Sequence, residues 1–544
     1  MHIPAVRLVV PLCIGIAVAD AWLLNSQLPI GAYLGLLAIL LALLMVCHKW
    51  KARITFVCGS ALFVFTFGAM RCQMRHDDIV NKVKYHAHSL RGRVSEAMRP
   101  RTNSVEVTVK TQEGTLVLAY TKQTTKLEIG DFIHVFTLHG LEPTYTEYKS
   151  VSDTSSHLNY QLQQYRHSLY RRGIAATCYA DSIAVIPSSS GITPPLTTKL
   201  HSLQTAMVEA YHDAGFDGDE GALVEAMTTG SRINLSSELR TQYSRAGTSH
   251  VLALSGFHLT IIYALLEILL FTHLLHGWWR RGMRMVGIGF IWAFVVVAGA
   301  PSSLVRAAIM CTLLAVSQIM TVSMSVDNQH INIRWDDFLD EMGENGLINS
   351  LAIAAIIMLI YDPFMMFDVG FQLSFTSMSG LCMCRDIVAR IMHVIKLVIP
   401  RFRPAAYFAV LLRWVVKSIV GVALTSLICT LFTFPLVAYY FGTIPTMSVV
   451  SNILIALPAF MLLVLAAVWW IAAPIAALQT MIGVCLTKTA GVMNGVTGWV
   501  ASMDHAVVVW HPTVMHVALV YALLFLLRKM YDILDVRSKM RYNQ

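Results

Sequence analysis

Charged side chains are scarce in this sequence of 544 residues. Asp, Glu, Lys and Arg make up 13% of it, whereas hydrophobic residues make up 56%. A soluble protein usually carries about 25% charged residues, so this composition excludes an ordinary soluble enzyme or binding protein. The apolar residues fall in runs of about 18 or more, long enough for helices to cross a hydrocarbon layer of about 30 Å. The sequence therefore predicts a polytopic α-helical membrane protein.

We expect no cleavable signal peptide at the N-terminus. The apolar run at 5–24 is followed almost at once by another at 29–46, with no A-x-A-like cleavage site. The net charge of +9 is explained by membrane topology, because Lys and Arg collect beside the cytoplasmic ends of membrane helices. Net charge alone therefore does not indicate nucleic-acid binding.

The distribution of basic residues predicts the orientation in the membrane. We expect three N-terminal helices at 5–24, 29–47 and 54–70, and the link before the third carries Lys49 and Lys51. That link, and with it the N-terminus, is expected in the cytoplasm. Because residues 71–245 contain no spanning run, we expect them to fold outside the cytoplasm, on the periplasmic side of a cell inner membrane.

Apolar runs resume after this exposed segment and bring the expected total to about ten to twelve helices. They lie at 250–276, 285–299, 303–322, 347–361, 370–384, 416–442, 447–468, 480–501 and 512–528. Residues 385–403 are basic, with apolar residues at helical spacing, which favours a helix on the cytoplasmic membrane surface or a buried connector helix. Basic residues after 528 place the C-terminal tail in the cytoplasm.

The exposed segment is rich in β-forming residues. Short runs of this kind lie at 91–94, 105–109, 115–120 and 132–136, with more strands expected near 174–186. Short strands at this spacing are typical of a small barrel such as an OB-fold, and a generic small β domain fits nearly as well. We also expect helices at 160–172 and 197–245.

Cysteines are few outside the membrane runs. Of ten in the chain, only Cys72 and Cys178 lie in the exposed region. An oxidising compartment permits a disulfide, so we predict that these two pair and join the ends of the β domain, with two free thiols as the alternative.

The first polar cluster inside the membrane runs lies at 244–258 and includes His250, Ser255, Gly256 and His258. Such residues are costly in lipid and should face protein or water. The cluster lacks the G-x-S-x-G pattern of a hydrolase. On an unbroken helix the two histidines would lie about 12 Å apart, too far to ligate one metal ion. Polar packing between helices and contact with a permeating polymer both remain open.

The second cluster, at 299–306, combines Gly299 with Pro301, Ser303 and Arg306. Gly and Pro should break the helix, and Ser303 is a candidate cap for the next one. A broken helix in a membrane protein is tolerated where it lines a cavity. The new N-terminus and Arg306 suit a phosphate group, while a snorkelling arginine at the interface is the alternative.

Two further segments complete the pattern. The third carries Asp368, Gly370, Gln372 and Ser374, where Asp368 is a candidate N-cap. A capped re-entrant turn explains these residues as well as a functional role does. The fourth, at 435–458, is typical of a helix end with an aromatic interface belt.

These four segments, in this order, resemble the competence domain of the ComEC family of DNA-uptake proteins. The matching stretches are 246–258, 301–310, 362–375 and 435–458. More loosely, residues 92–94, 130–131 and 165–174 are similar to the family's extracytoplasmic OB-like domain. The resemblance divides the chain into N-terminal membrane helices (1–70), an OB-like domain (71–190), a helical connector (191–245), the channel domain (246–530) and a tail (531–544).

The resemblance implies an inner-membrane channel that admits single-stranded transforming DNA to the cytoplasm. On that basis Arg306 and the helix N-termini would meet phosphates, while Ser255, His258 and Gln372 would line or gate the path. The implied partners are single-stranded DNA, the lipid bilayer and a separate DNA receptor, nuclease and helicase-type motor. No cofactor and no metal ion are expected.

One departure from the family pattern concerns enzymatic activity. Many members end in a metallo-β-lactamase-like domain, whereas this sequence stops at Gln544, and its His86 and His88 lack the rest of the H-x-H-x-D-H motif. We therefore expect no nuclease in this polypeptide. The alternative function is a transporter or membrane-embedded hydrolase that acts on another anionic envelope molecule.

Overall fold

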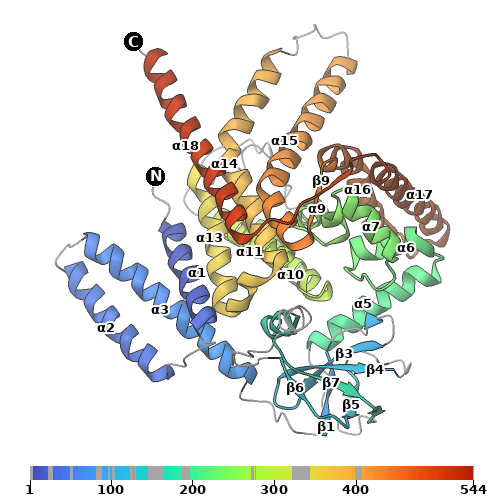
Figure 1. The fold of residues 1–544 in the computed structure, drawn as a ribbon. Coiled ribbons are helices and arrows are strands. Elements are labelled where there is room, and N and C mark those ends of the chain that lie inside the picture. The colour runs from blue at the N-terminus through green and yellow to red at the C-terminus, as the bar shows by residue number, and fades with distance from the viewer. Residues whose placement is uncertain are drawn as a thin grey trace. The chain divides into compact units, whose positions relative to one another are not determined.

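The computed structural model describes most of the chain (Figure 1). The described residues are 4–22, 29–49, 53–80, 88–95, 99–100, 104–122, 127, 130–144, 165–186, 196–270, 275, 277–321, 343–398 and 407–542. The chain divides into two compact units. The first comprises Met1–Leu203 with Arg334–Asp368, and the second comprises Gln204–Ile333 with Val369–Gln544.

The first unit contains a group of packed helices. They are α1 (Pro4–Trp22), α2 (Ile30–Lys49), α3 (Arg53–Val80), α13 (Gly343–Tyr361) and the short 3-10 helix η1 (Pro363–Phe367). Helix α1 packs against α3 and α13, and α2 packs against α3. Small residues permit the close approach of α1 to α3, since a Cβ atom at Gly15 would lie 2.1 Å from the Phe65 carbonyl oxygen.

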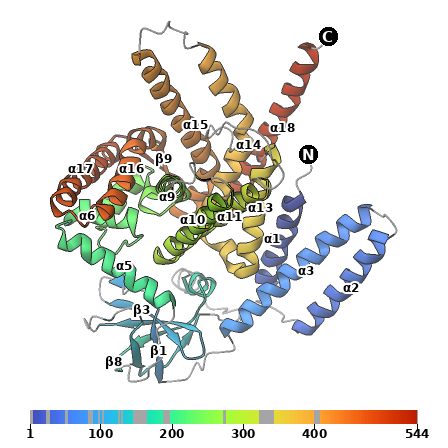
Figure 2. The same ribbon diagram turned by 180° about the vertical axis from the view of Figure 1, so that it is seen from behind.

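The same unit contains the β domain, whose strands gather in one sheet in both views (Figures 1 and 2). The strands are β1 (Ser89–Val94), β2 (Arg99–Pro100), β3 (Val105–Thr111), β4 (Leu116–Thr121), β5 (Phe132–Phe136), β6 (Glu142–Pro143), β7 (Ile174–Ala180) and β8 (Ser182–Val185). They form where β-branched and aromatic residues predict them. Alternate residues such as Val107, Val117 and Ile133 fill the core under the sheet.

The sheet is open, so the predicted OB-like barrel is not what the described strands form. Their order is β6-β7-β4-β3-β1-β5-β8, with β2 paired to β3, and no pairing among these residues joins β6 to β8. The β4–β7 pair is parallel, whereas the other pairs in this sheet are antiparallel. To close the sheet into a barrel, the two edge strands, β6 with two residues and β8 with four, would have to pair with each other, and they do not.

Both cysteines of the predicted disulfide are free thiols in the structure. Cys178 alternates onto the buried face of β7 and lies in the core of the sheet, where burial raises the pKa of its thiol to about 12. Cys72 is buried on helix α3. Each thiol therefore packs as a small apolar group in its own element.

The second unit is helical. Its helices are α5 (Leu196–Asp213, which begins in the first unit), α6 (Gly218–Thr228), α7 (Ser237–Arg245), α8 (Ser249–Leu252), α9 (Gly256–Leu269), α10 (Gly277–Val297), α11 (Ser302–Thr321), α14 (Val369–Val398), α15 (Tyr407–Phe441), α16 (Ser448–Ile471), α17 (Ala476–Ala501) and α18 (Val514–Tyr542). Strands β9 (Thr443–Pro445) and β10 (Val507–Val509) form a short antiparallel pair. A core of buried residues joins α6, α7, α16 and α17.

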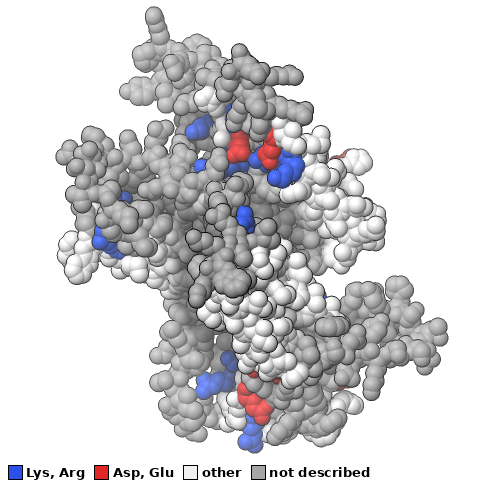
Figure 3. All heavy atoms as spheres, turned by 90° about the vertical axis from the view of Figure 1, so that its left-hand side faces the viewer, with Lys and Arg blue, Asp and Glu red and all other residues white. Residues whose placement is uncertain are grey.

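Several described helices are long and apolar enough to cross a membrane. Four qualify by length and composition: Thr55–Val80, Val415–Phe441, Ser448–Ile471 and Ala476–Ala501. Shorter apolar helices lie at Ile30–Val46, Gly256–Leu269, Ser302–Val316 and Gly346–Tyr361. Among the described atoms on the face drawn in Figure 3, red and blue atoms lie beside each other at the upper and lower ends. These features are those of a helical membrane protein.

Several helix boundaries differ from those expected: α10 begins at Gly277 rather than 285, α15 begins at Tyr407 rather than 416, and α18 continues to Tyr542 rather than ending at 528. Helix α3 continues to Val80 rather than ending at 70. The runs at 370–384 and 385–403 join in one continuous helix, α14, up to Val398, because nothing between them breaks helical geometry. The expected helix at 250–276 is instead divided into α8 and α9. Residues 327–346 form a polar stretch with several acidic residues between two apolar runs, and its part 327–342 lies outside the described residues, as does His86.

Candidate functional site

The first polar cluster lies where the chain turns sharply between α7 and α9. Gly247 has a φ of 76°, a left-handed conformation that favours glycine. A Cβ atom there would also come within 2.6 Å of Ser448 Cβ and 2.9 Å of Pro445 Cβ. The turn therefore packs the first cluster against the start of α16, which belongs to the fourth segment. His250 follows on α8 and is exposed.

Helix α9 begins with a reciprocal contact between Ser255 and His258. The Ser255 backbone N–H donates to His258 Nδ1 at 3.1 Å, and the Ser255 hydroxyl lies 2.8 Å from the same nitrogen. Because Nδ1 accepts from the backbone, a neutral ring carries its proton on Nε2. His258 is 2% exposed, and its Nε2 has no hydrogen-bond partner among the described residues. The ring is therefore fixed in orientation, with one polar edge unsatisfied.

Helix α11 begins after the predicted break. Gly299 and Ala300 both have positive φ angles, 80° and 48°. The Pro301 carbonyl then accepts from the backbone N–H groups of Leu304 and Val305 at 2.9 and 3.0 Å. Ser303 is not the cap, since its hydroxyl donates to the Leu254 carbonyl at 3.0 Å. This bond joins the start of α11 to the residue just before α9 begins.

Arg306 lies one turn into α11 and is only 6% exposed. Its Nη1 donates to the Ser374 carbonyl on α14, and its guanidinium carbon lies 5.8 Å from the centre of the Phe375 ring. The Nε has no partner among the described residues. A buried guanidinium keeps its charge, so this hydrogen bond and the cation–π contact partly replace the water that it has lost.

Gly256 gives Arg306 its space. A Cβ atom at Gly256 would lie 3.1 Å from Arg306 Nη2 and 3.3 Å from Ala307 Cβ, closer than side chains ordinarily pack. Ser255, Gly256, His258, Ser303, Arg306 and Ser374 therefore converge from the starts of α9, α11 and α14, and we call this group the helix-break site.

The other predicted residues of the third segment lie just before α14 or in its first turn. Gln372 Oε1 accepts from the Tyr440 hydroxyl at 2.8 Å, which joins α14 to α15. Gly370 is exposed at the start of α14, and Asp368 is exposed just before it. None of the contacts described above joins Gly370 or Asp368 to Arg306. The functional roles predicted for all these residues stay predictions.

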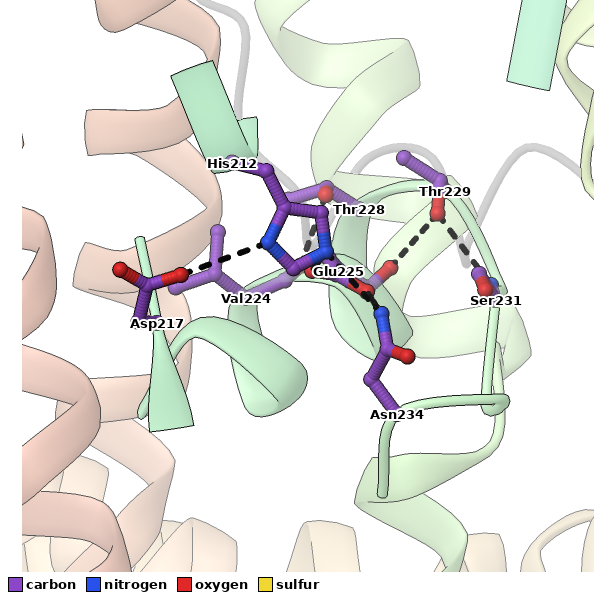
Figure 4. Close-up of polar contacts among 8 residues, drawn as sticks. All are labelled: His212, Asp217, Val224, Glu225, Thr228, Thr229, Ser231 and Asn234. Carbon is purple, nitrogen blue, oxygen red and sulfur yellow. Dashed lines mark hydrogen bonds and ion pairs between the residues drawn. The ribbon is translucent and has the colours of Figure 1, made fainter. Parts of the chain in front are cut away.

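Sequence reasoning missed a second polar cluster, in the connector (Figure 4). Its centre is Glu225 on α6, 1% exposed, whose Oε2 accepts from Asn234 Nδ2 at 2.9 Å. His212, at the end of α5, places Nε2 3.2 Å from Glu225 Oε1 and Nδ1 3.5 Å from Asp217 Oδ1. Burial raises the pKa of the Glu225 carboxyl, although the Asn234 hydrogen bond and the nearby His212 oppose that shift.

The signal for this second cluster was a lone acidic residue in the apolar run 221–228, whose partners lie in other elements. No group of three or more His, Cys, Asp or Glu side chains within the described ranges is arranged to hold a metal ion. In this cluster the two carboxylates face opposite nitrogens of one ring, so they cannot converge on one cation.

Comparison with known proteins places this arrangement in a family. The model of the family "Competence protein" matches residues 227–328 and 342–531, more than half of the chain, and these ranges contain the whole helix-break site. The chain belongs to this family, the ComEC competence proteins. It is also 24% identical over 237 residues to ComE operon protein 3 of Bacillus subtilis (strain 168). That match covers 43% of this chain and 24% of the relative, so the chain spans about a quarter of the relative's length. No solved structure matches this competence protein.

Proposed function

We propose that this protein is an inner-membrane channel that passes single-stranded DNA into the cytoplasm during natural competence. In this proposal the β domain lies on the periplasmic side, and both termini lie in the cytoplasm. The chain conducts DNA and does not cleave it, while a separate receptor, nuclease and motor supply the other steps. Membership of the competence protein family supports a role of this kind.

The observation that carries the proposal is the buried Arg306, which lies where the protein chain breaks before α9 and again before α11. Three polypeptide segments far apart in the sequence meet at one permanent positive charge, beside the starts of α9 and α11. A nucleic-acid strand presents one phosphate charge per nucleotide, and guanidinium groups bind phosphate with bidentate geometry. We assign Arg306 to meet the phosphates of the strand in transit; in the described state its guanidinium joins α11 to α14 through the Ser374 carbonyl.

The experiment measures labelled DNA that reaches the cytoplasm in cells that carry the native chain, Arg306→Ala, Arg306→Lys or His258→Ala. Arg240→Ala is the matched control, because this arginine of α7 is exposed and its Nη2 donates to the backbone carbonyl of nearby Arg232. Membrane abundance and DNA bound at the cell surface are measured for each variant. We expect Arg306→Ala to lose cytoplasmic DNA while surface binding persists, and Arg306→Lys to recover only part, since an ammonium lacks the planar fork.

Two outcomes would contradict the proposal. If deletion of the gene leaves uptake unchanged, the protein does not carry DNA, and a transporter or hydrolase for another anionic envelope molecule takes its place. If Arg306→Ala and Arg240→Ala behave alike at equal abundance, the helix-break site is not on the path.

A further inference from the structure

The turn at Ile360–Phe367, which leads into α14, is held in the first unit by arginines that no motif singled out. They are Arg71 and Arg75 on α3, and Arg171 at the end of the helical stretch 165–171 of the β domain. Each arginine contacts a different part of the turn, and we call the three together the arginine clamp.

Arg71 holds the first part of the turn, where α13 ends. Its Nε and Nη2 donate to the Ile360 carbonyl at 3.0 and 2.8 Å, and Nη2 also reaches the Tyr361 carbonyl at 3.1 Å. The last carbonyls of a helix have no partner within the helix, and a cation there also complements the helix dipole. Arg71 is therefore a C-cap for α13, supplied by another helix.

Arg75 holds the next residue, Asp362. Its Nη2 lies 3.4 Å from Asp362 Oδ2, while Asp362 Oδ1 accepts from the Phe364 backbone N–H at 3.1 Å. One carboxylate thus caps η1 and binds α3 at the same time. The Arg75 guanidinium also passes the β domain at Gly173, where a Cβ atom would lie 3.0 Å from Nη2 and where the φ of 81° favours glycine.

Arg171 holds the far end of the turn. Its guanidinium carbon lies 3.9 Å from the centre of the Phe367 ring, and its Nη2 forms a 2.6 Å ion pair with Asp20 on α1. The neighbouring Tyr170 packs its ring 5.1 Å from that of Phe364 and places its hydroxyl 2.6 Å from His76 Nδ1 on α3. The β domain therefore contacts the same turn through two successive residues.

We propose that Arg71, Arg75 and Arg171 are positioning residues for the transport path: they hold the turn Ile360–Phe367 between the membrane helices and the β domain, and so determine where α14 begins. Hydrophobic packing alone is not directional and would hold the turn against its neighbours without fixing its exact position. The clamp adds directional contacts to its carbonyls, its one carboxylate and its last ring. Gln372 and Ser374 follow the turn directly along the chain, on α14, so we expect a change in the turn to reach them through the backbone.

This inference rests on the proposed function where DNA uptake is measured, so the test also includes a measurement that does not depend on DNA. Hydrogen exchange of residues 358–368 is measured in purified protein carrying Arg75→Asp, Asp362→Arg or both substitutions. We expect faster exchange in each single variant and restoration in the double variant, where the ion pair is reversed. Cytoplasmic uptake should follow the same pattern, with a coupling of about tenfold between the positions, as for charged residues in contact.

If the cells do not produce the charge-reversed variants, Arg75→Lys replaces them. This variant keeps the positive charge but lacks the longer guanidinium that contacts Asp362. Arg172→Ala, at the residue that follows the clamp, is the control for general damage to the β domain. Normal exchange and normal uptake in Arg75→Lys and Arg75→Asp would overturn the inference, as would single-variant losses that the reversed pair does not restore at equal abundance. Deletion of the gene tests the proposed function separately.

Discussion

At the scale of single residues, the helix-break site depends on how a permanent charge is kept in apolar surroundings. Arg306 is 6% exposed and has the Ser374 carbonyl and the Phe375 ring as its described contacts. Removing one partner of a buried charged group costs about 3–5 kcal/mol, because the other is left without compensation. Small changes near this guanidinium should therefore have large effects.

Gly256→Ala is the smallest such change. The added methyl group would lie 3.1 Å from Arg306 Nη2, so the guanidinium must shift by a few tenths of an ångström in its contact with α14. We expect lower DNA uptake at normal membrane abundance. Gly289→Ala on α10 is the matched control, because a Cβ atom there meets nothing within 4 Å. Equal uptake in the two variants would show that the position of Arg306 does not matter.

Glu225 offers a test through pH. Burial raises the pKa of its carboxyl, so the folded protein binds this proton more tightly than the unfolded chain does. Its contribution to stability is therefore present at low pH and is lost as the pH rises through the raised pKa. We expect Glu225→Gln, neutral at every pH, to gain in Tm relative to the native protein as the pH increases above the ordinary pKa of glutamate. Thermal unfolding in detergent from pH 4 to 8 measures this, and a constant difference in Tm would contradict it.

At the scale of elements, helix starts and breaks place the functional residues. Serine and glycine decide several of them: Gly247 turns the chain before α8, Ser255 begins α9, and Ser236 caps α7 by accepting from the Leu239 N–H at 3.1 Å. Helix α7 in turn packs against α17, so its start matters for the core of the second unit.

Ser236→Ala should lower the free energy of unfolding of the second unit by about 1 kcal/mol, the usual contribution of a serine N-cap. Ser237→Ala is the control, because Ser237 is the next residue, its side chain is exposed, and it is not the cap of the helix. Denaturant unfolding of the purified proteins would measure both. A loss of the same size in the two variants would contradict the assigned cap.

The sequence predicted the helices and strands better than it predicted the breaks between them and the contacts that join them. The strands followed from β-forming residues at 105–109 and 132–136, and the break before Arg306 followed from Gly299 and Pro301. The division of α8 from α9 was missed because residues 251–254 are apolar and suit a helix. The Glu225 cluster and the arginine clamp were missed because their partners are far apart in sequence and only the fold brings them together. The open sheet depends on pairing between distant strands, which a local pattern does not encode.

At the scale of the whole molecule, this is a helical membrane protein of the competence family in which the starts of several helices meet at one buried charge, Arg306. The two units each carry part of the third segment, since Asp368 closes one and Val369 opens the other. The arginine clamp acts on the first side of this junction and the helix-break site on the second. A path for DNA must involve residues of the second side if the proposal is correct.

The most direct measurement is photo-crosslinking of incoming labelled DNA to this competence protein in living cells. A photoreactive amino acid is placed in turn at Phe257, Gln372 and Tyr440, beside the helix-break site, and at Phe290 as a control on the exposed face of α10. If the helix-break site lies on the path of DNA, we expect crosslinks to single-stranded DNA at one or more of the first three positions, only during uptake, and none at Phe290. DNA that reaches the cytoplasm with no crosslink at the three positions, or with equal crosslinking at Phe290, would contradict it.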